Sequence, residues 1–327
     1  MRQLLNQLRH STLPELTREI YEVCRLLFKI MIPVLLVVKL LEELGAIPYI
    51  SRALEPIMQL VGLPDSMGLV WTTTLLTNIY AGMLIFFQLA PQEHLTVAQV
   101  TVLSSMMLIA HSLPLELRIV QKAGVKLMVA LLIRLLSALV LGALLHYSYR
   151  WGDWLQQPVV LLWQPPVTDD SLLSWGLNQL KSFGVIILII AALMSLLRFL
   201  RWIHIERLMI WLLQPVLKLL GISTQATSLT IIGVTLGLSF GGGLLIREAQ
   251  SGKISAKDCF SALCLLSLSH SIIEDTLLVM TLGADLSGVL WARLAFSFIF
   301  VAIMTRWLNR TSEHTQQRWL LHSVAKD

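Results

Sequence analysis

Long apolar runs separated by short polar segments organise this chain. The runs at 26–41, 125–145 and 183–200 approach the ~20 residues that a helix needs to cross the hydrocarbon of a bilayer. Two further apolar runs contain unexpected polar sequences, HSLPLE at 111–116 and HSIIED at 270–275. The pattern predicts an all-α, polytopic membrane protein.

Composition agrees with this interpretation and argues against a nucleic-acid-binding function. Of the 327 residues, 56% are hydrophobic and 14% are charged, whereas soluble domains carry about 25% charged residues. The net charge of +5 fits basic residues beside membrane helices, so we expect the lipid bilayer as a partner and no nucleic acid. Cys24, Cys259 and Cys264 lie in apolar settings without a disulfide or zinc spacing. No cofactor is expected.

The chain contains an internal duplication. One offset of 159 residues, the separation of His111 and His270, brings rare residue types into register over about 130 positions without a gap. Proline, glycine, acidic and basic residues coincide at this offset: Pro56 with Pro215, Gly62 with Gly221, Gly82 with Gly241, Glu116 with Asp275, and Arg134 with Arg293.

The two copies have reversed charge in their flanking segments. In the first, the loop 91–95 lacks Lys and Arg, and 118–126 is basic; in the second, 247–257 is basic and the segment around Asp285 is acidic. Because basic loops stay in the cytoplasm, the halves are predicted to form two inverted-topology repeats. The same rule places both termini in the cytoplasm of a multi-pass protein of the cell (inner) membrane.

The expected organisation has five parts. They are a cytoplasmic amphipathic N-terminus (1–20), a first repeat (21–148), an external interfacial linker rich in Trp and Pro (149–173), a second, inverted repeat (174–307) and a basic cytoplasmic tail (308–327).

One segment of each half does not fit a plain spanning helix. Residues 66–90 contain TNIYAG, and the matching part of the second half reads GLSFGGG. Asn and Gly are poor in helix interiors, and irregular backbone at membrane depth must be covered by protein or line a cavity. We expect a broken or re-entrant helix here; the alternative is a close helix contact lined by glycine.

The paired polar segments are the candidate site. Ionisable residues inside a membrane are costly and are usually functional. The alternative is that they are helix-end groups bonded to neighbours. Because His and acid are five residues apart, a helix break would be needed for both to reach one ion; whether that ion is a metal stays open. The candidate binding residues of the two segments are His111, Ser112, Glu116, His270, Ser271, Glu274 and Asp275.

Two arginines lie within the apolar runs that follow these segments. An unpaired guanidinium there is costly, so Arg134 and Arg293 are expected either to pair with Glu116 and Asp275 or to bind an anion such as phosphate.

The paired halves, SFGGGLLIREAQSGKIS and HSIIED, resemble the Gate, or "nucleoside recognition", membrane domain. Concentrative nucleoside transporters, the membrane part of ferrous iron transporter B and spore-maturation membrane proteins share this domain. The resemblance implies re-entrant hairpins and broken helices whose tips hold the solute. By position that role falls on the two His-Ser segments and on Asn78, Gly82, Ser239, Gly241, Gly242 and Gly243. The chain lacks the nucleotide loop and the pore cysteine arrangement of the iron transporters.

The leading hypothesis is a secondary transporter, not an enzyme, that moves a small polar solute by alternating access between the halves. Candidate solutes are a nucleoside-like compound, a divalent cation or a phosphate-bearing lipid precursor; a homo-oligomer stays open. The alternative is a membrane scaffold or assembly factor whose polar residues are structural. A Ser–His hydrolase is disfavoured because adjacent helical residues point to different sides.

Overall fold

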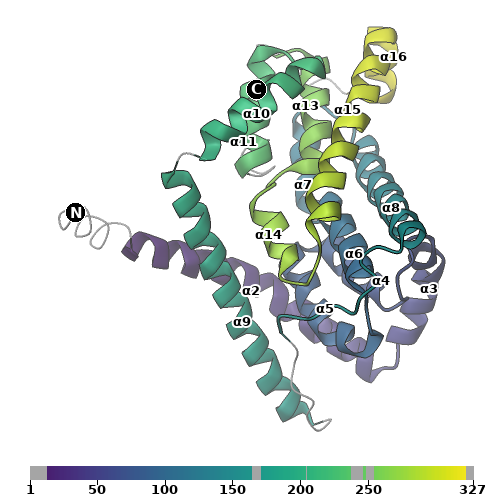
Figure 1. Cartoon of the computed structure of the whole chain (residues 1–327), viewed down its shortest axis with the longest axis vertical. Helices are drawn as coiled ribbons and strands as arrows, with labels where there is room; N and C mark the ends of the chain where they lie inside the picture. The colour runs from purple at the N-terminus through teal and green to yellow at the C-terminus, as the bar shows by residue number, and fades with distance from the viewer. Residues whose placement is uncertain (1–12, 164–170, 204, 237–245, 248–253, 322–327) are drawn as a thin grey trace.

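A computed structural model describes residues 13–163, 171–203, 205–236, 246–247 and 254–321 (Figure 1). Within these ranges the chain forms helices and no β-strand, as the sequence predicts. The helices are α2 (Leu13–Glu43), α3 (Ile47–Leu60), α4 (Met67–Leu76), α5 (Ile79–Glu93), α6 (Val97–Ile109), α7 (Leu113–Lys122), α8 (Leu127–Gly152), α9 (Leu172–Trp202), α10 (Ile205–Leu219), α11 (Thr224–Leu236), α13 (Ala256–Ser269), α14 (Glu274–Met280), the π-helical turn η2 (Ser287–Ala292), α15 (Arg293–Arg310) and α16 (Glu313–Trp319).

The helices recur along the chain at the offset found in the sequence. The bounds of α9 are those of α2 moved by 159 residues, and α6 and α13 begin 159 residues apart. Left-handed backbone recurs as well, at Gly62 and Gly221 and at Gly124 and Gly283. Glycine suits these turns because it lacks the Cβ that makes positive φ unfavourable. Equivalent segments of the halves therefore have equivalent local structures.

Among the described residues, five segments are long and apolar enough to cross a membrane, and they divide into central and outer spans. Of the most apolar window, 83% is buried in the span Val97–Lys122 (α6–α7) and 72% in Ala256–Met280 (α13–α14). The share falls to 33% in Leu127–Gly152, 22% in Leu173–Leu200 and 33% in Ser287–Arg310. Exposed apolar surface on the outer spans suits contact with lipid, whereas polar residues on the central spans are covered by protein.

Helices α4 and α5 form a hairpin that breaks where the sequence predicts. The Ser66 hydroxyl, before α4, donates to Glu93 Oε1, at the end of α5, over 2.6 Å. At the tip, Asn78 caps α5 by accepting from the Ala81 amide. A Cβ on Gly82 would collide with the Thr74 hydroxyl, so glycine permits the close approach of the two helices. Whether the hairpin re-enters or spans a membrane stays a prediction.

The two central spans run antiparallel. Cys259, near the start of α13, contacts the carbonyl of Ala123, just after α7. At the other end, the amide of Asp285, beyond α14, donates to Thr101 near the start of α6. Figure 1 shows the same arrangement, with α7 above α6 and α14 below α13. An inverted-topology repeat requires this crossing; the orientation of each half in a membrane stays a prediction.

Some elements extend beyond the expected boundaries. Helix α2 begins at Leu13, inside the segment 1–20 that we separated from the first repeat, and α8 continues to Gly152, into the expected linker. Both extensions are amphipathic or polar, so a prediction from hydropathy alone makes these helices too short. The glycine-rich candidates of the second half, Ser239, Gly241, Gly242 and Gly243, lie outside the described residues.

Candidate ion-binding site

The first central span is interrupted between α6 and α7. Helix α6 ends at Ile109, and Ser112 has left-handed backbone with φ of 48°. Pro114 lies in the first turn of α7, where its missing N–H costs no helical hydrogen bond. The Ser112 amide instead donates to the carbonyl of Thr74, in α4, over 3.1 Å. The hairpin and the proline together hold the break open.

The second central span is interrupted at the equivalent place without a proline. Helix α13 ends at Ser269, α14 begins at Glu274, and Ser271 repeats the left-handed backbone with φ of 47°. The Ile272 amide donates to the carbonyl of Val234, in α11, over 3.1 Å. Strained backbone persists only where surrounding contacts fix it, and a backbone carbonyl supplies such a contact in both halves, from α4 in the first and from α11 in the second.

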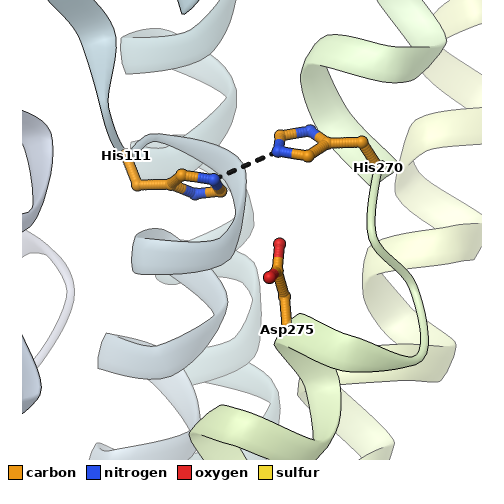
Figure 2. A group of neighbouring side chains, drawn as sticks. All are labelled: His111, His270 and Asp275. Carbon is orange, nitrogen blue, oxygen red and sulfur yellow. Dashed lines mark hydrogen bonds between the residues drawn. The ribbon is translucent and has the colours of Figure 1, made fainter. Parts of the chain in front are cut away.

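The two histidines meet between these breaks. The Nε2 atoms of His111 and His270 are 3.1 Å apart (Figure 2), and the two residues are 5% and 3% exposed. Each is the fifteenth residue of its span. The antiparallel crossing therefore brings equivalent residues of the two halves face to face.

Each imidazole is oriented by the last turn of its own helix. His111 Nδ1 lies 2.9 Å from the carbonyl of Met107, and His270 Nδ1 lies 2.7 Å from the carbonyl of Leu266. A carbonyl can only accept, so each Nδ1 must carry the proton that it donates. These carbonyls, which the sequence analysis did not identify, direct both Nε2 atoms toward the gap between the halves.

Two carboxylates lie close to the histidine pair, Glu116 in direct contact with both rings and Asp275 at a larger distance. Glu116 Oε1 is 3.2 Å from His111 Nε2 and 3.3 Å from His270 Nε2, and the residue is 5% exposed. Asp275 is partly buried, and its carboxylate points toward the rings in Figure 2. Ligand atoms of His111, His270 and Asp275 all lie within 4.8 Å of one another. The helix break thus allows acids five residues after each histidine to reach one place.

The buried arginines are equivalent in sequence but have different partners. Arg134 forms an ion pair with Glu116 Oε2, and its Nε donates to the Ile109 carbonyl over 3.0 Å. Arg293 donates to the carbonyls of Leu268 and His270, each over 2.9 Å. Among the described residues, no salt bridge joins Arg293 to Asp275.

The remaining candidates surround this centre less directly. Glu274 begins α14 and is partly buried beside Asp275. Ser112 and Ser271 shape the backbone, and within the described chain neither hydroxyl is hydrogen-bonded to a histidine. Asn78 and Gly82 belong to the hairpin whose α4 contacts the first break. Within the part of the chain that the structure describes, three buried donor atoms of residues that flank the site have no hydrogen-bond partner: Arg134 Nη2, Arg293 Nη1 and Thr276 Oγ1.

Comparisons with known proteins bear on the family and the class of the protein. Residues 24–126 match the Gate family, described as nucleoside recognition, which confirms the expected resemblance for that part of the chain. The chain is 27% identical over 306 residues to a Bacillus subtilis (strain 168) protein described as the uncharacterized membrane protein YvoD; the match covers 91% of this chain and 93% of that protein. No solved structure matches the chain. The protein is thus a helical membrane protein in which residues 24–126 match the Gate family model.

Proposed function

We propose that the protein is a secondary transporter whose solute or ion binds where the two broken central spans meet. The observation that carries the proposal is the buried contact between His111 and His270 at the breaks of two antiparallel spans. Broken helices near the membrane midplane are typical of substrate sites in transporters built from inverted repeats. Alternating access would then move one half against the other around this contact.

The environment of the contact supports a binding role. Polar and ionisable groups inside a membrane are costly unless they pair with one another or serve a pathway. Here two imidazoles and two carboxylates gather at one place, and Thr276 adds a buried hydroxyl that has no hydrogen-bond partner among the described residues. A cation is the ligand that these acceptor groups favour most among the candidate solutes.

The sidedness we propose places both termini in the cytoplasm of a cell (inner) membrane. Lys126, in the basic turn after α7, donates to the carbonyl of Arg318 in the C-terminal α16. Glu15, at the start of α2, pairs with Arg198 near the end of α9 over 3.1 Å. Segments to which the positive-inside rule assigns the same side are therefore neighbours, which supports one common cytoplasmic face.

Uptake into proteoliposomes tests the proposal. A panel of nucleosides, divalent cations and isoprenoid phosphates would be offered to the purified full-length protein. For the solute that is taken up, His111→Ala and His270→Ala should each reduce uptake at least tenfold. His146→Gln, which changes a histidine of α8 outside the site, should not. Unchanged uptake by the two site variants would rule out this location. A folded protein that moves none of the solutes would favour the scaffold alternative.

A further inference from the structure

We infer that the contact between the halves is a binding site for a divalent first-row transition-metal ion, with His111 Nε2, His270 Nε2 and Glu116 Oε1 as ligands. This inference rests on the proposed function for the role of the metal as cargo. The site itself is argued from geometry alone.

The first argument is the arrangement of protons. Both Nδ1 atoms donate to backbone carbonyls, so a neutral imidazole presents only a lone pair at Nε2. Glu116 Oε2 accepts from Arg134, which leaves Oε1 as a further acceptor. Three acceptors therefore face one another without a donor of their own, and they repel one another unless a cation lies among them.

The second argument is the size of the triangle that these atoms form. Its sides are 3.1 Å between the two Nε2 atoms and 3.2 and 3.3 Å from these atoms to Glu116 Oε1. Ligands about 2.0–2.1 Å from a tetrahedral metal ion are about 3.3–3.4 Å apart. An ion at such a distance from all three atoms would lie about 0.9 Å outside the plane of the triangle. The three atoms thus match one face of a tetrahedral site.

A shared proton would explain the arrangement less completely. A proton between the two Nε2 atoms satisfies one side of the triangle and leaves Glu116 Oε1 without a donor of its own. A metal ion on the axis of the triangle satisfies all three acceptors together. The geometry therefore favours a metal over a proton.

The groups around the ligands have the arrangement found in metal sites. A histidine that binds a metal almost always donates its other N–H to a carbonyl or carboxylate, which fixes its orientation. His111 and His270 both do so, and Arg134 holds the second oxygen of Glu116. Asp275, within 4.8 Å of both histidines, is placed to approach as a fourth ligand or to balance the charge of the ion.

The donor set defines the class of ion. Imidazole nitrogen suits zinc and its first-row neighbours, whereas Mg²⁺ and Ca²⁺ prefer oxygen ligands. Among the described residues, the group of neighbouring ligand atoms at this place includes no cysteine. Zn²⁺ and Co²⁺ are accordingly the probes for this site.

The experiment titrates Co²⁺ and then Zn²⁺ into the metal-free, full-length protein in detergent. We expect visible absorption of tetrahedral Co²⁺ at one ion per chain, abolished when Zn²⁺ displaces it. His111→Ala, His270→Ala and Glu116→Gln should each weaken binding at least tenfold, and His146→Gln should leave it unchanged. Tryptophan fluorescence and gel filtration would confirm that each variant is folded.

A ligand exchange keeps the test decisive if the alanine variants do not fold. His270→Cys retains a metal ligand and should add a sulfur-to-cobalt charge-transfer band, which a purely structural histidine cannot produce. No Co²⁺ spectrum in the folded wild-type protein, or the same spectrum in wild type and in the double variant His111→Ala/His270→Ala, would overturn the site. Binding of Zn²⁺ without its uptake into liposomes would keep the site and contradict transport of the metal. Uptake of another solute by a protein that binds no metal would overturn the metal site and leave the proposed transport function standing.

Discussion

The different partners of the two buried arginines predict a measurable asymmetry between the halves. Arg134 is 0% exposed and forms an ion pair with Glu116, whereas Arg293, 1% exposed, is held by two backbone carbonyls. Removing one partner of a buried pair costs about 3–5 kcal/mol, because the other charge stays buried without compensation. Glu116→Gln and Arg134→Met should therefore each lower the free energy of unfolding by about that amount.

Two double-mutant cycles separate this interaction from the general cost of each change. In the cycle of Glu116→Gln with Arg134→Met, the double variant should be less destabilised than the sum of the single ones by about 2–3 kcal/mol. In the equivalent cycle of Asp275→Asn with Arg293→Met, the coupling should be clearly smaller, because within the described residues no salt bridge joins the two side chains and only their electrostatic attraction couples them.

Unfolding by SDS in mixed micelles, followed by tryptophan fluorescence, gives these energies. A chelator must be present throughout, so that loss of a bound metal does not contribute to the cost of Glu116→Gln. Equal coupling in the two cycles would refute the asymmetry, and so would coupling below about 0.5 kcal/mol in the first cycle.

Three further predictions test the breaks, the hairpin and the crossing of the spans. Ser112→Gly should keep or raise thermal stability, whereas Ser112→Val should lower the free energy of unfolding by about 1–2 kcal/mol, because a β-branched residue resists left-handed backbone; equal effects would contradict the backbone argument. Gly82→Ala should cost about 1–3 kcal/mol through overpacking, and Thr74→Ala, which removes the colliding hydroxyl, should recover part of that loss in the double variant. The Asp285 amide donates to the Thr101 hydroxyl, so cysteines introduced at these two positions should cross-link under mild oxidation in a variant without the native cysteines. Failure of the pair to cross-link would contradict the antiparallel crossing.

The breaks in the central spans could be predicted from the sequence, because residue types that are rare in this apolar chain mark them. His111 and His270 share one offset, and the five-residue spacing to Glu116 already required a break for both groups to face one ion. Pro114 supplies a local cause for the first break. The second break has no such signal, because its cause is a tertiary contact with the Val234 carbonyl.

The partners of the arginines could not be predicted in the same way. Glu116 and Asp275 are equivalent by position, and the sequence made each a candidate partner of an arginine or a candidate ligand of the solute. Glutamate is longer by one methylene, and in this structure Glu116 contacts the histidines with one oxygen and Arg134 with the other. Asp275 lies within 4.8 Å of both histidines, and among the described residues no salt bridge joins it to an arginine. A difference of one carbon in reach decides the network, and only the three-dimensional arrangement reveals it.

The meeting of equivalent histidines has a consequence for the origin of the molecule. A half-length ancestral chain could have built the same contact by pairing with an antiparallel copy of itself, with one histidine type on the twofold axis. In such a homodimer every change occurs twice, so both acids and both arginines must remain identical. Fusion of the two copies into one gene removes that constraint. The glutamate on one side and the aspartate on the other are a divergence that a dimer of two identical chains cannot have.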